Sequence, residues 1–326
     1  MQVLKYLFLP LSWLYLLVTS IRNGLYDTGI FKSYTFDVKV ICVGNLSVGG
    51  TGKSPMIEYL IRHYQHQFEI AVLSRGYKRK TSGFVEVHQD MTADEVGDEP
   101  LQFKRKFNSV HVFVDADRKN GIEQIQKLYP NIQLILLDDA FQHRRVKADI
   151  NILLTTYDKP FYKDFVLPVG RLRESCRGKK RADIIILTKC PKALSEDKKS
   201  KIINNIKPKP HQSVLFSSIT YSDKIYSQNQ VLDFKDLNDF HLITGIANPK
   251  PLLNYLNQNG KTFEHQNFPD HHQFTSQELE NFQNLTKPIL TTEKDYTRLV
   301  DYLDKDLFYL PIEVELDKDL NLILEK

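Results

Sequence analysis

The sequence predicts an α/β protein with a doubly wound, mostly parallel sheet, a smaller second α/β domain and an apolar helix at its N-terminus. Short runs rich in Ile, Val and Leu alternate with segments of helical periodicity, which is typical of buried parallel strands covered by helices. A glycine-rich loop follows the first of these runs, and the linker KPKP begins at residue 207. The 326 residues suffice for about two domains.

The first domain is expected over residues 31–206. Its strands and helices alternate in the order that a parallel sheet with crossover helices requires. Strands are expected at 39–43, 69–73, 110–114, 133–137, 150–155 and 183–188, and helices at 54–65, 99–107, 117–128 and 195–205. Ligands of such sheets bind at the carboxyl ends of the strands.

The second domain is expected over residues 207–326. Its apolar runs are short and spaced like the strands of a smaller α/β unit, which we expect to close over the ligand site and exclude water. These strands are expected at 214–221, 241–244, 263–268, 289–292 and 307–316.

Residues 1–30 are expected to form a membrane-associating helix. Between Val3 and Ile21 the only charged side chain is Lys5, and the aromatic residues Trp13 and Tyr15 suit a membrane interface. A spanning helix needs about 20 mostly apolar residues, and this stretch only just provides them. The pattern favours a helix lying on the membrane surface. A single span and a buried core helix remain alternatives.

The overall charge does not indicate nucleic acid, because the formal net charge is only +4. Basic residues nevertheless cluster at 75–80, 104–106 and 171–181. Each cluster is either a solvated face or a surface for an anionic substrate or anionic lipid headgroups. Three cysteines without metal-ligand spacing indicate a reducing compartment and no disulfide framework.

The stretch VICVGNLSVGGTGKSP, residues 40–55, joins a predicted strand to a predicted helix through a glycine-rich loop. Its pattern is that of a P-loop, in which backbone N–H groups and the helix N-terminus bind nucleotide phosphates. Ser47 stands where the strict pattern has glycine. Lys53 would contact the β- and γ-phosphates, and the Ser54 hydroxyl would hold Mg²⁺. The predicted nucleotide-binding residues are Ser47, Val48, Gly49, Gly50, Thr51, Gly52, Lys53 and Ser54.

The segment QLILLDDAFQHRRV, residues 133–146, is an apolar strand that ends in two carboxylates. In a P-loop protein, an Asp at the end of such a strand coordinates Mg²⁺ directly or through water. We assign Asp138 to the metal and Asp139 to a supporting or substrate role. Two alternatives remain: the roles of the two aspartates are exchanged, or the pair merely caps the turn. His143 on the following loop is a candidate orienting donor.

Two further polar segments are candidates for the site. Asp98 and Glu99, in VGDEP, stand at the start of a predicted helix, where Asp98 is either an N-cap or a carboxylate that accepts a proton from an attacking hydroxyl. The loop FPDHHQF, residues 268–274, lacks zinc-ligand spacing. TTEKD, residues 291–295, is equally well a surface turn or part of the site.

The motifs GNLSVGGTGKSP, LSRGYKRK, VGDEP, LLDDAFQHRRV, LPVGRLRE, GIANP, FPDHH and TTEKD occur in the order seen in tetraacyldisaccharide 4′-kinases. The chain resembles that family up to about residue 298. The resemblance implies transfer of the γ-phosphoryl group of ATP·Mg²⁺ to the 4′-hydroxyl of an acylated glucosamine disaccharide 1-phosphate, in lipid A biosynthesis. It implies work at the cytoplasmic face of the bacterial inner membrane, without an obligate protein partner. Ala140 replaces the glycine usual in the family but leaves both aspartates.

The resemblance also implies roles for matching residues. Asp98 resembles the catalytic base, with His271 as its partner. Glu99, Asp138 and Asp139 resemble the family's ring of carboxylates around the metal and the attacking hydroxyl. Candidates for the substrate phosphate or the transition-state charge are Arg75, Arg118, His143 and Arg171.

Two rival functions fit parts of the pattern. One is a membrane-associated P-loop ATPase that acts as a switch or adaptor, although Val48 stands where such switches usually carry Lys. The other is a guanine-nucleotide metal chaperone. The scattered cysteines oppose it, and so does TKC at 188–190, which lacks the Asp of a guanine-reading motif.

Overall fold

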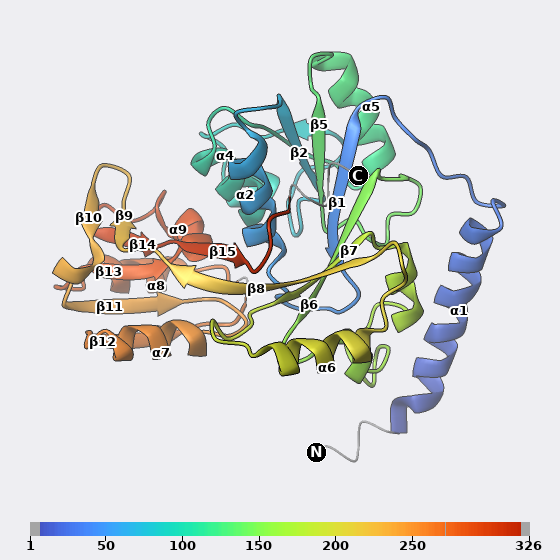
Figure 1. The fold of residues 1–326 in the computed structure, drawn as a ribbon. Helices are drawn as coiled ribbons and strands as arrows, with labels where there is room; N and C mark the ends of the chain where they lie inside the picture. The colour runs from blue at the N-terminus through green and yellow to red at the C-terminus, as the bar shows by residue number, and fades with distance from the viewer. Residues whose placement is uncertain (1–6, 271, 321–326) are drawn as a thin grey trace.

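The computed structural model describes residues 7–270 and 272–320, which form two sheets with their covering helices (Figure 1). The strands of the larger sheet are β1 Lys39–Asn45, β2 Ile70–Ser74, β3 Val85–Glu86, β4 His111–Val114, β5 Leu134–Asp138, β6 Ile150–Thr156, β7 Ile184–Thr188, β8 Ser213–Tyr221 and β15 Ile312–Leu316. Their spatial order is β15-β8-β7-β6-β1-β5-β2-β4-β3. All neighbours from β8 to β4 are parallel, and only the edge strands β15 and β3 are antiparallel. The predicted mostly parallel sheet is confirmed.

The larger sheet is buried on both faces because its strands are apolar on both faces. In β1, Ile41 and Val43 enter one core, while Val40 and Cys42 enter the other. The first core also holds side chains of α2 (Lys53–Tyr64) and α4 (Asp98–Lys106). The second holds side chains of α5 (Arg118–Leu128). Helices therefore cover both faces of the sheet.

The smaller sheet has the order β10-β9-β14-β13-β11-β12. Its strands are β9 Lys224–Tyr226, β10 Val231–Asp233, β11 Asp239–Thr244, β12 Thr262–Asn267, β13 Ile289–Thr292 and β14 Leu307–Leu310. The helices of this part are α7 Lys250–Gln258, α8 Ser276–Gln283 and α9 Glu293–Leu299. Side chains of α7 pack in one core of this sheet, and side chains of α8 and α9 pack in another. We call residues 222–310 the C-terminal unit.

The sheets do not divide at residue 207, and this part of the sequence prediction is corrected. Strand β8, expected in the second domain, pairs with β7 of the larger sheet in the register Ile185↔Val214. The KPKP segment is therefore a connection between α6 (Glu196–Ile206) and the next strand of the same sheet. The single strand expected over 307–316 is two strands, because Pro311 separates β14 of the smaller sheet from β15 of the larger one.

Helix α1 (Leu9–Asp27) lies along one side of the larger domain, apart from both sheets (Figure 1). Its polar residues face the protein: the Ser12 hydroxyl donates to Val166 O, and the Tyr15 hydroxyl donates to Arg173 O. Its apolar residues are exposed, namely Leu11, Trp13, Leu14, Leu17, Val18 and Ile21. The helix is thus amphipathic rather than uniformly apolar. Over the described residues, no helix has the length and apolar character needed to cross a membrane.

The C-terminal unit contacts the larger domain through α9, which packs against α4. Lys106 at the end of α4 pairs with Glu293 at 2.5 Å and with Glu58 of α2 at 2.7 Å. Arg105 pairs with Asp301 at 2.9 Å. Charged side chains therefore link α2 and α4 of the larger domain to α9 of the C-terminal unit.

Candidate active site

The loop between β1 and α2 has the geometry of a phosphate cradle. Gly52 precedes α2 with φ at 87°, a left-handed conformation that favours glycine. The N-cap residue, Gly52, has no side chain that could cap the first turn of α2. The backbone N–H groups of this turn, together with the positive end of the helix dipole, are therefore available to an anion.

Neighbouring segments hold this loop in place. Asn45 Nδ2 donates to Thr51 Oγ1 at 2.6 Å, and Thr188 Oγ1 donates to the Thr51 carbonyl at 2.8 Å. Lys189 Nζ donates to the carbonyl of Gly50 at 2.8 Å. Lys189 thus places a second ammonium group beside the loop. Lys189 is not among the predicted site residues, because in the sequence it is an isolated basic residue after an apolar strand.

The carboxylate of Asp139, the residue directly after β5, lies between two cations. Lys53 Nζ is 3.7 Å from Asp139 Oδ1, and Arg173 Nη1 donates to both Asp139 oxygens at 2.9 and 3.1 Å. Burial alone would raise the pKa of Asp139, but Lys53 and Arg173 hold it below its ordinary value. Asp139 is therefore an ionised carboxylate that orients Lys53. Arg173 was not among the predicted residues, although it lies in the LPVGRLRE motif.

Asp138, predicted to bind the metal, is almost completely buried at the end of β5. Ser74 Oγ donates to its Oδ2 at 3.0 Å, whereas its Oδ1 is buried without a partner among the described residues. Burial and the nearby charges of Glu99 and Asp139 raise the pKa of Asp138 to about 7. In the described part of the chain, no group of three or more His, Cys, Asp or Glu residues is arranged to hold a metal ion by itself.

Helix α4 brings the carboxylate of Glu99 to the first turn of α2 and begins with a second carboxylate, Asp98. Ser54 Oγ donates to Glu99 Oε1 at 2.8 Å. Gly97, with φ at 95°, allows the turn that starts α4, and Asp98 is 7% exposed. The backbone N–H of Glu99 donates to Asp98 Oδ1 at 3.0 Å. This contact holds Asp98 Oδ1 at the start of its own helix, while its other oxygen, Oδ2, lies 3.9 Å from Lys294 Nζ.

Asp98 also lines a cleft of about 290 Å³ between the larger domain and the C-terminal unit. Tyr77 and Lys78 line one side, and Phe274 and Arg298 line the other. His271, the predicted partner of Asp98, lies outside the described residues. Its neighbour His272 is 3.0 Å from Glu278, which caps the start of α8.

The predicted substrate residues divide into two places. Arg75, Arg118 and His143 lie close enough to influence one another's charge. Arg118 is 1% exposed, and its guanidinium donates to the carbonyls of Asp115 and Asp138 at 2.6 and 3.1 Å. These contacts position the end of β5. Burial, Arg118 and Arg75 lower the pKa of His143 to about 4, so this imidazole is neutral near pH 7.

Arg171 lies elsewhere, on the loop that leads to Arg173. Its Nε donates to Asp164 Oδ2 at 2.8 Å, and its carbonyl accepts from Val48 N at 2.8 Å. Arg171 therefore supports the phosphate loop through its backbone, while Arg173 contacts Asp139 of the site.

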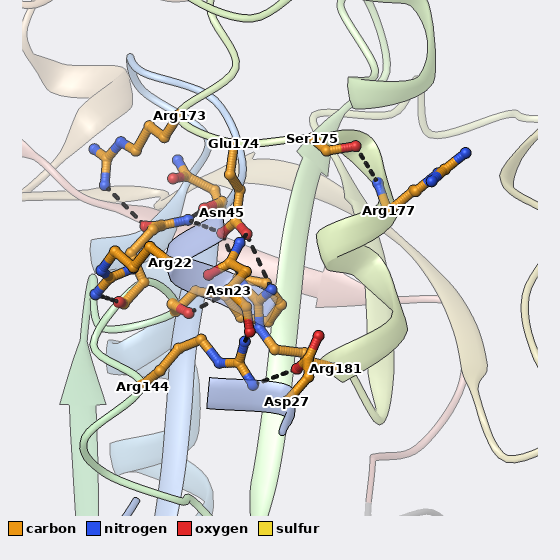
Figure 2. Close-up of polar contacts among 12 residues, drawn as sticks. Arg22, Asn23, Asp27, Asn45, Arg144, Arg173, Glu174, Ser175, Arg177 and Arg181 are labelled. Carbon is orange, nitrogen blue, oxygen red and sulfur yellow. Dashed lines mark hydrogen bonds and ion pairs between the residues drawn. The ribbon is translucent and has the colours of Figure 1, made fainter. Parts of the chain in front are cut away.

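Glu174 connects α1 to this region (Figure 2). Its carboxylate accepts from Asn23 of α1 at 2.6 Å and from Gln142 Nε2 at 3.0 Å, and it pairs with Arg181 at 2.7 Å. Gln142 Nε2 also donates to the carbonyl of Asn45, at the end of β1. A short polar network therefore runs from α1 to the strand that precedes the phosphate loop.

Comparison with known proteins agrees with this geometry. The family model for tetraacyldisaccharide-1-P 4′-kinase matches residues 4–326. The tetraacyldisaccharide 4′-kinase of Flavobacterium johnsoniae is 49% identical over 319 residues, which cover 96% of this chain and 93% of that protein. The tetraacyldisaccharide 4′-kinase of Phocaeicola vulgatus is 42% identical over 338 residues, with 98% and 92% covered.

A solved structure has the same architecture. The LpxK of Aquifex aeolicus, determined in complex with ATP, is 29% identical to this chain and superposes with a TM-score of 0.80. The match covers 98% of each chain. The chain therefore belongs to the tetraacyldisaccharide-1-P 4′-kinase family, and it is a kinase of lipid A biosynthesis.

Proposed function

We propose that the protein transfers the γ-phosphoryl group of ATP to the 4′-hydroxyl of a tetraacyl glucosamine disaccharide 1-phosphate at the cytoplasmic face of the bacterial inner membrane. The hydrogen bond from Ser54 to Glu99 carries this proposal. It joins the phosphate-binding turn of α2 to the start of α4, where Asp98 lies. All the groups named below come from one chain, so the proposal needs no protein partner.

Residues 47–54 would bind the phosphates of ATP. Backbone N–H groups of the loop and of the first turn of α2 would face phosphate oxygens. Lys53, held by Asp139, would contact the β- and γ-phosphates. Lys189 would add a second positive charge at the loop.

Ser54 and Asp138 would hold Mg²⁺. The buried Oδ1 of Asp138 lacks a described partner, and a carboxylate oxygen of this kind fits a hard cation. Burial, and after it the charges of Glu99 and Asp139, raise the pKa of Asp138, and a divalent cation would favour its ionised form. When bound, Mg²⁺ would neutralise charge on the phosphate oxygens.

Asp98 would act as the general base. It lines the cleft between the two parts of the protein, where a sugar hydroxyl could approach the γ-phosphate. As the hydroxyl oxygen attacks phosphorus, its proton would pass to Asp98, the bond to the bridging oxygen would break, and ADP would leave. His271 would be the partner of Asp98, and Glu99 would hold Ser54 in place.

The remaining predicted substrate residues would interact with negative charge on the substrate or in the transition state. Arg75 is exposed next to this region and is suited to direct contact with a phosphate group. Arg118 would act mainly by positioning the carbonyls of Asp115 and Asp138. Arg171 would act mainly through its own carbonyl, which accepts from Val48 N. His143, being neutral, would donate one hydrogen bond without adding charge.

Helix α1 would lie on the membrane with its exposed apolar residues in the lipid. Trp13 is 66% exposed and Leu17 is 55% exposed, on the face away from the protein. An amphipathic helix with an apolar face of this kind binds in the interface between headgroups and acyl chains. The acyl chains of the substrate would then lie in the same layer as α1.

Transfer of label from γ-labelled ATP tests the proposal. Purified protein, Mg²⁺ and the disaccharide lipid in mixed micelles should give labelled lipid, and a chelator of Mg²⁺ should abolish the reaction. Label found only as free phosphate would instead favour a P-loop ATPase switch.

A further inference from the structure

Lys294, the second residue of α9, lies at a junction of three carboxylates. Its Nζ is 3.9 Å from Asp98 Oδ2, 4.0 Å from Glu99 Oε1 and 3.6 Å from Asp270 Oδ1. Asp98 and Glu99 belong to α4 of the larger domain, whereas Asp270 and Lys294 belong to the C-terminal unit. One ammonium group therefore joins the two parts of the protein at the candidate base.

We infer that Lys294 is a positioning residue for phosphoryl transfer, which holds Asp98 and Glu99 in their working arrangement when the C-terminal unit is docked. This inference rests on the role proposed above for Asp98.

The charges explain why a cation is needed at this position. Three carboxylates gathered around one point repel one another, and a positive charge among them offsets that repulsion. The side chains of Lys294 and Asp98 are only 19% and 8% exposed, so water and salt screen this interaction less than a surface ion pair. The separations of 3.6–4.0 Å are ion-pair distances, at which a compact ammonium group can interact with several carboxylates together.

Glu99 relays this arrangement to the phosphate-binding turn. The same Oε1 atom that faces Lys294 accepts the hydrogen bond of Ser54 Oγ at 2.8 Å. A chain of contacts thus runs from the C-terminal unit through Lys294 and Glu99 to the hydroxyl assigned to Mg²⁺.

Contacts next to Lys294 fix its position relative to α4. Its neighbour Glu293 pairs with Lys106 at 2.5 Å, and Asp301 pairs with Arg105 at 2.9 Å. Movement of the C-terminal unit away from α4 would therefore withdraw Lys294 from Asp98 and Glu99 together. Docking of this unit would complete the catalytic arrangement, as closure does in other transferases.

The test compares Lys294→Met, which keeps the length of the side chain but removes its charge, with Lys294→Arg. We expect Lys294→Met to lower kcat roughly 10²-fold, as misplacement of a catalytic group does. The ATP dissociation constant should change less than about twofold, because none of the contacts described for Lys294 involves Lys53 or the backbone N–H groups proposed to bind the phosphates. Lys294→Arg should recover activity to within about tenfold of the natural protein.

Lys287→Met is the matched control. Lys287 belongs to the same unit and pairs with Asp239 at 3.0 Å, so this variant also removes one paired lysine. It should retain full activity. Thermal unfolding of each variant tests whether it is folded. If Lys294→Met does not fold, Lys294→Gln takes its place.

Three results would overturn the inference: a kcat for Lys294→Met within about threefold of the natural value, parallel loss of kcat and ATP affinity, or no rescue by arginine. Asp98→Ala is measured alongside. If Asp98→Ala is inactive while Lys294→Met is active, only the inference about Lys294 fails. If Asp98→Ala is fully active, the proposed role of Asp98 fails.

Discussion

Ser54 Oγ donates a hydrogen bond of 2.8 Å to Glu99 Oε1 and thereby joins the first turns of α2 and α4. The two residues are far apart in the sequence, and each begins a helix on the same face of the larger sheet. Because both helix N-termini meet here, we propose that the phosphate loop and Asp98 belong to one site. The predictions below test the parts of this arrangement separately.

Lys53→Ala should lower phosphoryl transfer by at least about 10²-fold, because it removes the charge that would stabilise the transferring phosphate. The fold should be retained, since Asp139 keeps its two contacts with Arg173. Steady-state transfer and thermal unfolding measure the two effects. Lys39→Ala, at the exposed start of β1, is the control and should leave both unchanged.

Asp98→Ala should lower kcat by about 10²–10⁴-fold if Asp98 is the general base. Asp98→Asn is the informative companion, because an Asn side chain can still accept the hydrogen bond from the Glu99 N–H. Kinetics with saturating ATP measure both. If Asn restored the activity, Asp98 would serve only as a cap.

Arg173→Ala should reduce transfer more than Arg171→Ala. Arg173 contacts both oxygens of Asp139, which in turn holds Lys53, whereas the Arg171 side chain pairs with Asp164. We expect a loss of about 10-fold or more for Arg173→Ala, comparable with the removal of a charge-assisted hydrogen bond. Equal kinetics for the two variants would mean that the Arg173–Asp139 pair does not affect catalysis.

Replacing Trp13 and Leu17 with Glu should weaken binding to anionic lipid vesicles by at least about tenfold. Burial of each apolar side chain contributes about 1.5–3 kcal/mol, and 1.4 kcal/mol is a tenfold change in affinity. Tyr302→Glu changes an equally exposed aromatic residue in the C-terminal unit and is the control. Vesicle sedimentation measures binding, and unaltered sedimentation of the Trp13 and Leu17 variant would show that α1 is not the membrane contact.

Glu293→Gln should make the stability of the protein less dependent on pH. Burial and the charge of Glu58 raise the pKa of Glu293 to about 7, against the opposing effect of Lys106. The folded protein thus holds this proton more tightly than the unfolded chain does. Its stabilising contribution is complete below the ordinary pKa of 4.5 and is lost as pH rises through about 7.

The loss amounts to at most about 3 kcal/mol. Thermal unfolding from about pH 5 to pH 8 measures it. Lys106 keeps its pair with Glu58 in the Gln variant. Glu264→Gln, which changes an exposed carboxylate, should follow the natural profile. Superimposable profiles for Glu293→Gln and the natural protein would contradict the assignment.

Local patterns were sufficient to predict β1, β2 and β4 to β7 of the larger sheet and the glycine-rich loop after β1. The strand of residues 39–43, the glycines and the Lys53-Ser54 pair are adjacent in the chain, and their spacing alone defines the loop. The position of Asp138 at the end of a strand was predictable for the same reason, because it directly follows an apolar run. The division between sheets was not predictable, since β8 has the same apolar character whichever sheet it joins.

Contacts between distant segments account for what was missed. Lys189, Arg173 and Lys294 reach the site from the end of β7, from a loop and from α9. Each is one basic residue among many in the sequence, and only the tertiary structure distinguishes it from a basic residue that is exposed to solvent. Arg171 shows the same limit: it lies two residues from Arg173, yet its side chain pairs with Asp164.

The most direct test of the central claim is mass spectrometry of the disaccharide lipid after incubation with ATP, Mg²⁺ and the purified protein. We predict that the lipid gains one phosphoryl group, that fragmentation places it on the 4′ position, and that Asp98→Ala gives almost none of this product. An unmodified lipid recovered while ATP is consumed would contradict the claim that the P-loop and Asp98 form one phosphotransfer site.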